Sequence, residues 1–136
     1  MIVLLDTDVL IDVALDRAPH ADSAASLLDR LERRPGSAFV AWHTIANLYY
    51  LVAPARGGRP TRDFVLDLLR FVEAAPATTA ALRKATRLEI RDFEDAMQVV
   101  AAEACGADVI ATRNIRDYTK SRVRVATPKT LLDELG

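Results

Sequence analysis

Short apolar runs alternate with longer amphipathic segments along the chain. The segments 2–5, 38–41 and 108–111 are too short for helices. Their consecutive apolar positions, which begin at Val109 in the last of them, are typical of strands buried on both faces of a sheet. Residues 72–75 predict a short further strand, and the alternating stretch 122–126 predicts an edge strand.

Between these strands, apolar residues recur at the spacing of a helix face. Helices are predicted to begin at or near Asp8, after Pro19, at His43 or Thr44, at Thr61, at Thr78 or Thr79, at Asp92 and at Pro128. The stretch 54–60 is the most loop-like part of the chain because it is rich in glycine and proline. Strands that alternate with helices predict an α/β fold, in which helices cover both faces of a parallel sheet within a single domain, residues 1–136.

Composition narrows the classes of protein to which the chain can belong. Its 136 residues, 51% of them hydrophobic, suit one domain with a substantial core. The 19 acidic and 18 basic side chains leave a net charge of −1, which excludes a uniformly basic protein that coats nucleic acid. The sequence has no secretory signal and no apolar stretch near the roughly 20 residues that span a bilayer, so we expect a cytoplasmic protein with no membrane partner.

Polar side chains gather after two of the predicted strands and at the start of one helix. The set comprises Asp6 and Asp8 after the first strand, Asp92 and Asp95 at the helix start, and Thr112, Arg113, Asn114, Arg116 and Asp117 after the strand at 108–111. Each acid taken alone fits an ordinary role as a helix cap or turn residue. Sites in open α/β sheets form beyond the carboxyl ends of the strands, so we expect these side chains to meet at one edge of the sheet.

Carboxylates that meet in this way repel one another unless a cation lies between them. Hard divalent cations prefer such oxygen ligands, and Mg²⁺ commonly combines a few carboxylates with water and phosphate oxygens. The pattern therefore predicts metal-assisted phosphoryl chemistry.

These residues resemble the PIN domain family. Residues 4–10 (LLDTDVL) are similar to its opening element, residues 92–96 (DFEDA) to its third acidic element, and residues 106–118 to its closing strand and loop. The resemblance covers essentially the whole chain. It implies a three-layer α/β/α sandwich and an Mg²⁺- or Mn²⁺-dependent ribonuclease that leaves a 5′-phosphate and a 3′-hydroxyl. Many small bacterial members are VapC-type toxins, which implies an RNA substrate, an antitoxin partner and a homodimer.

The resemblance and the positions of these residues suggest a role for each one. The expected roles are catalytic metal ligand (Asp6, Asp95, Asp117), further metal contact (Asp8, Asn114), support of the site (Asn47, Thr112, Asp92) and substrate binding (Arg113, Arg116).

One position departs from the family pattern. The family's second acid lies on the helix after the second strand, and the matching residue here is Asn47. Asparagine offers a neutral oxygen and cannot act as a general base. Three interpretations stay open: Asn47 ligates weakly while Asp8 supplies charge, the chain belongs to a subgroup that works with asparagine, or it is a catalytically impaired module that binds RNA or protein.

A different enzyme class also fits the first acidic element. Asp6-Thr7-Asp8 after an apolar strand resembles the nucleophile motif of haloacid-dehalogenase-type phosphatases. That family also needs a later lysine and a Gly-Asp motif, and the chain has three lysines and no Gly-Asp pair. This alternative is therefore the weaker one.

Overall fold

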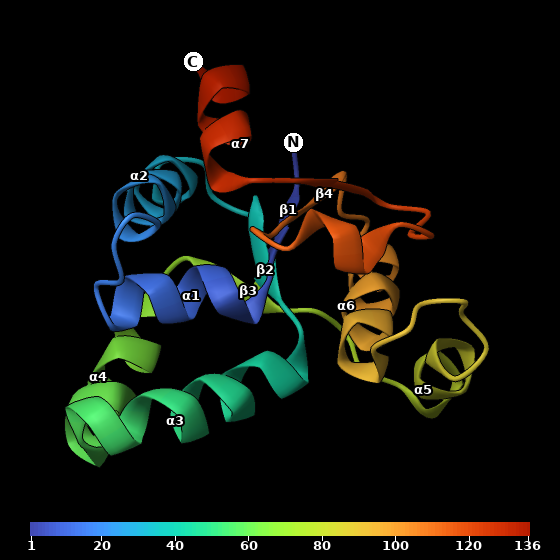
Figure 1. The fold of residues 1–136 in the computed structure, drawn as a ribbon, viewed down its shortest axis with the longest axis horizontal. Coiled ribbons are helices and arrows are strands. Elements are labelled where there is room, and N and C mark those ends of the chain that lie inside the picture. The colour runs from blue at the N-terminus through green and yellow to red at the C-terminus, as the bar shows by residue number, and fades with distance from the viewer.

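The computed structural model describes residues 1–136 as alternating strands and helices (Figure 1). In chain order the elements are β1 (Val3–Leu5), α1 (Thr7–Ala14), α2 (Ala21–Glu32), β2 (Ala38–Val40), α3 (Trp42–Arg56), α4 (Gly58–Leu68), β3 (Val72–Ala74), α5 (Thr79–Ala85), α6 (Phe93–Ala104), β4 (Val109–Ala111), the 3₁₀ turn η1 (Ile115–Tyr118), β5 (Arg124–Ala126) and α7 (Pro128–Leu135). No helix is long and apolar enough to cross a membrane.

The five strands form one parallel sheet in the order β3-β2-β1-β4-β5. The strands β1, β2 and β4, predicted from continuous apolar runs, occupy its centre. The strand β5, predicted from alternating residues, lies at one edge, as expected. Chain order reverses at the pair β1–β4, so the sheet has a switch point between the two strands that precede the predicted polar clusters.

Helices cover both faces of the sheet, which confirms the predicted α/β architecture and the three layers. Alternate side chains of β1 point to opposite faces: Val3 and Leu5 pack with α1, α2, α3 and α7, whereas Leu4 packs with α5 and α6. Figure 1 shows α1 and α2 on one side of the sheet and α6 on the other. Both faces are buried, which explains the unbroken apolar strands.

The predicted loop at 54–60 is wrong, because helix α3 continues to Arg56 and α4 already begins at Gly58. Proline is tolerated at both places. Pro54 lies in the last turn of α3, and Pro60 lies in the first turn of α4, where its missing N–H has no partner to lose. Only Gly57, with φ of 95°, breaks the two helices apart.

The strand ends hold the predicted polar clusters next to each other. The backbone N–H of Asp6 donates to the carbonyl of Ala111 at 2.9 Å, and the N–H of Thr112 donates to the carbonyl of Ala126 at 3.0 Å. The last residues of β1 and β4 are thus paired, and the chain segments that leave them emerge side by side at the carboxyl edge of the sheet.

Candidate active site

Asp6 lies at the centre of this edge and is only 5% exposed. It caps α1, since its Oδ1 accepts the N–H of Thr7 at 2.7 Å. The same Oδ1 accepts the side-chain amide of Gln98 at 3.3 Å, and Oδ2 accepts the hydroxyl of Tyr118 at 2.8 Å. Capping and participation in the polar cluster are therefore compatible roles for this residue.

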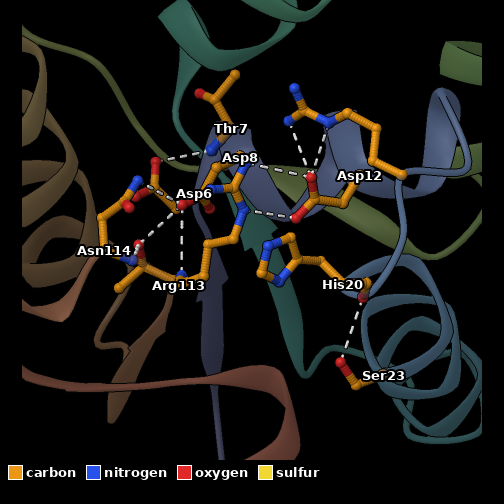
Figure 2. Close-up of polar contacts among 10 residues, drawn as sticks. Asp6, Thr7, Asp8, Asp12, His20, Ser23, Arg113 and Asn114 are labelled. Atoms are coloured by element: carbon orange, nitrogen blue, oxygen red, sulfur yellow. Dashed lines mark hydrogen bonds and ion pairs between the residues drawn. The ribbon is translucent and has the colours of Figure 1, made fainter.

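Asp8 points toward the segment that follows β4 (Figure 2). Its Oδ2 accepts three hydrogen bonds: from the Thr112 hydroxyl and the Arg113 N–H, both at 3.3 Å, and from the Asn114 side-chain amide at 2.9 Å. The other carboxylate oxygen, Oδ1, is buried and has no hydrogen-bond partner. Thr112 and Asn114 therefore both contact the Asp8 carboxylate.

The acids of α6 separate into two roles. Asp92 is exposed and caps the helix, since its Oδ1 accepts the N–H of Asp95 at 3.1 Å. Asp95 is partly buried and close enough to Asp6 to be affected by its charge. Asp117 is exposed on η1, and its charge also acts on Asp95. We call Asp6, Asp8 and Asp95 the carboxylate cluster.

Ionisation of the whole cluster is unfavourable. Burial raises the pKa of Asp6. Burial and the negative charge of Asp6 together raise the pKa of Asp8 to about 7. Burial, followed by the charges of Asp6 and Asp92, raises the pKa of Asp95 to about 7. Each carboxylate therefore lies where burial and neighbouring negative charge oppose its charged form.

Four residues that the sequence analysis did not select complete this site. Gln98 is fully buried and donates to the Thr44 hydroxyl at 2.9 Å as well as to Asp6. Tyr118 is 2% exposed, and burial together with the nearby carboxylates raises its pKa, so that it remains a hydrogen-bond donor. Glu94 accepts the Thr7 hydroxyl at 3.4 Å, and its charge acts on Asp6.

Asn47 is half-buried on α3, and its side chain makes no hydrogen bond. It lies one turn after Thr44, which contacts Gln98, and so shares the face of α3 that points toward the site. His43, one turn before Asn47, also lies near the site, because the charges of Glu94 and Asp6 act on it, while burial lowers its pKa.

The two predicted substrate-binding arginines differ in environment. Arg113 is bound through its guanidinium to Asp12, with Nε 2.8 Å from Oδ2 and Nη2 3.3 Å from Oδ1 (Figure 2). Arg116 is exposed and has no ion pair. Asp12 is 1% exposed and also binds Arg17 at 2.8 Å, a pairing that the sequence analysis did not predict.

The donor set fits a hard divalent cation. No three carboxylate, imidazole or thiolate side chains converge closely enough to form a complete cage. Mg²⁺ does not require one, because it typically takes one or two protein carboxylates and completes its shell with water and phosphate oxygens. The unpartnered, buried Oδ1 of Asp8 and the opposed ionisation of Asp6 and Asp95 are the observations that match such an ion.

The chain thus belongs to the structural class of α/β/α sandwiches that carry an acidic cluster at the switch point of the sheet. The sequence profile of the PIN domain family matches residues 2–116, and the chain is a member of that family. This membership replaces the haloacid-dehalogenase alternative. No protein of curated function matches the sequence significantly.

Solved structures share the fold at low sequence identity. VapBC2 from Rickettsia felis, bound to a DNA fragment from its promoter, is 18% identical with a TM-score of 0.71, covering 93% of this chain and 98% of that one. FitAcB from Neisseria gonorrhoeae is 20% identical with a TM-score of 0.65, covering 94% and 99%. Mycobacterium tuberculosis VapC20, a sarcin–ricin loop cleaving toxin, is 16% identical with a TM-score of 0.64, covering 79% and 86%.

Proposed function

We propose that the chain is an Mg²⁺- or Mn²⁺-dependent endoribonuclease of PIN type and the toxin of a toxin–antitoxin pair. The observation that carries the proposal is the carboxylate cluster: Asp6 after β1, Asp8 on α1 and Asp95 on α6 lie at one sheet edge in positions that oppose their ionisation. Family membership and the fold shared with a toxin that cleaves RNA support the substrate class.

The residues of the cluster divide the work. One or two carboxylates of the cluster (Asp6, Asp8, Asp95) would hold the metal together with water and phosphate oxygens, with Asp117 and the Asn114 side chain at its margin. When bound, the ion lowers the pKa of a water and stabilises the charge on the phosphate oxygens during in-line attack. Gln98 and Tyr118 orient Asp6 by donating to different carboxylate oxygens, and Thr112 orients Asp8.

The test is cleavage of single-stranded RNA by purified protein with Mg²⁺, with Mn²⁺ and with a chelator. Asp6→Asn and Asp95→Asn keep the shape of each side chain and remove its charge, and we expect activity to fall at least about 100-fold, the scale of about 2.7 kcal/mol in the barrier. Asp133→Asn, on the exposed side of α7, is the matched control and should cleave normally. Cleavage by Asp6→Asn at the wild-type rate would refute the assignment.

The impaired-module alternative rests on Asn47, and Glu94 argues against it. Glu94 places a further negative charge near Asp6 and contacts Thr7 at the start of α1. We propose that this charge compensates for the neutral residue at position 47. In calorimetry, the Glu94→Gln variant should then bind Mn²⁺ more weakly than the wild-type protein. If the wild-type protein itself bound no Mn²⁺, the result would favour the impaired module.

Protein partners are part of the proposal. Large apolar side chains are exposed on α3 and α4, with Trp42 at 65%, Tyr50 at 75% and Leu66 at 71%, which favours a protein partner over an isolated monomer. We expect a homodimer in light scattering. We also expect that a cognate antitoxin, sought among small proteins encoded next to this chain, forms a stable complex with it and suppresses RNA cleavage.

A further inference from the structure

A second polar cavity lies beside the carboxylate cluster. It has a volume of about 330 Å³ and lies between the α1–α2 connection and the start of α7. Its lining is almost entirely polar or proline: Val9, Asp12, Pro19, His20, Ser23, Arg113, Thr127, Pro128 and Lys129. We call it the basic pocket.

The charge of the basic pocket is positive. Asp12 is the only acid in its lining, and its charge is shared between the guanidinium groups of Arg113 and Arg17. Lys129 is exposed and forms no ion pair. His20 and Arg113 both line this pocket, and Figure 2 shows their side chains. A ligand for this pocket is therefore an anion.

Arg113 is held in position for such a ligand. Asp12 is 1% exposed and accepts Nε and Nη2 of Arg113 with separate oxygens, which fixes the plane of the guanidinium. Nη1 of Arg113 makes no hydrogen bond and stays available. A guanidinium held by a buried carboxylate loses little conformational entropy when it binds a phosphate.

The basic pocket is continuous with the carboxylate cluster through one residue. The backbone N–H of Arg113 donates to Oδ2 of Asp8 at 3.3 Å, while its side chain lines the pocket. A ligand that carries several phosphates along one strand can therefore contact both places at once. A single-stranded nucleic acid carries one phosphate per nucleotide and meets this requirement.

We propose that the basic pocket binds a phosphate group of the RNA strand that flanks the scissile phosphate. Arg113 and Lys129 contact the phosphate oxygens, and His20 and Ser23 border the adjoining sugar. The inference rests on the proposed function, because it takes RNA as the substrate, and it adds a binding site outside the carboxylate cluster.

The test measures binding of a fluorescent ten-nucleotide single-stranded RNA to the full chain at several KCl concentrations. All proteins carry Asp95→Asn to prevent cleavage. Removing one phosphate contact should weaken binding several-fold. It should also make the negative slope of log affinity against log salt shallower by about 0.7, and we expect both changes for Lys129→Ala. Arg34→Ala removes one exposed positive charge beyond the other end of α2, roughly 20 Å from His20, and should leave the slope unchanged.

Cleavage by the same substitutions in the otherwise wild-type chain separates this inference from the proposed function. Normal cleavage with equal salt slopes for Lys129→Ala and Arg34→Ala would refute the basic pocket and leave the nuclease intact. RNA binding that depends on Lys129 without any cleavage would support the pocket and refute the nuclease. Failure of the Asp95→Asn chain to bind RNA, together with no cleavage by the wild-type chain, would refute both. Displacement of RNA by polyglutamate at equal charge would assign the pocket to a protein ligand instead.

Discussion

Replacing Tyr118 by phenylalanine removes one hydroxyl from the centre of the carboxylate cluster. The hydroxyl is buried and donates to Oδ2 of Asp6 at 2.8 Å, and its hydrogen bonding opposes the rise in the pKa of Asp6. The aromatic ring still fills the same space beside α6, so the packing of the core is conserved. The substitution therefore isolates the contribution of one hydrogen bond to a buried carboxylate.

The expected loss depends on pH. A hydrogen bond to a charged group contributes about 1.5–3 kcal/mol, against about 1 kcal/mol for a neutral pair. The pKa of Asp6 is raised, and without the hydroxyl it rises further. A carboxyl group whose pKa is raised in the folded state stabilises the fold fully when the pH is below its unfolded-state pKa, which is near 3.8. This contribution is lost as the pH rises through the folded-state pKa. The variant should therefore be about 2 kcal/mol less stable where Asp6 is ionised, and the loss should fall toward about 1 kcal/mol as the pH is lowered and Asp6 becomes protonated.

Urea unfolding of the metal-free protein at pH 4 and at pH 8 measures this difference, and we expect the larger loss in the free energy of unfolding at pH 8. Tyr50→Phe is the matched control, because it removes the same atom from a side chain that is 75% exposed and makes no hydrogen bond. If Tyr118→Phe were as stable as Tyr50→Phe at pH 8, Asp6 would not depend on this donor and the argument for its orientation would fail.

Three further substitutions test other parts of the site. The rise in the pKa of Asp8 to about 7 corresponds to about 4 kcal/mol against the folded state at high pH. This penalty is reduced because Asp8 is partly exposed. Asp8→Asn should therefore stabilise the metal-free protein by on the order of 2 kcal/mol at pH 8 and by little at pH 4, as measured by urea unfolding. Asn47→Asp should raise Mn²⁺ affinity about tenfold in calorimetry, and equal affinities would place position 47 outside the reach of the ion. Asp12→Asn should raise KM for RNA about fivefold with little change in kcat, because Arg113 loses its anchor, whereas a fall in kcat alone would assign Asp12 to the chemistry.

The sheet could be predicted from the sequence because its strands are buried on both faces. Continuous apolar runs at 2–5 and 109–111 have no other stable place in a small α/β domain. The break between α3 and α4 was harder to predict, because two prolines near Gly57 suggested a long loop. Their effect depends on position within a helical turn, which the residue types alone do not reveal.

The acids of the site were predictable because each follows a strand or starts a helix. Gln98 and Asp12 were not selected, since each lies within a helix among apolar residues and belongs to no recognised motif. A polar residue on a buried helix face is itself a signal, because it needs a partner. The partners come from distant segments: Asp6 lies 92 residues from Gln98, and Arg113 lies 101 residues from Asp12. That pairing becomes visible only when the chain is folded.

Cationic and anionic groups lie side by side at this edge without neutralising each other, and Asp12 explains how. Arg113 follows β4 directly and contacts Asp8, so its guanidinium could close on that carboxylate and remove it from the cluster. The side chain instead binds the buried Asp12, and only its backbone N–H reaches Asp8. Asp8 thereby keeps an oxygen free for a cation, and Arg113 keeps an N–H free for an anion. A phosphodiester needs both, because negative charge on its oxygens must be stabilised while a nearby water loses a proton.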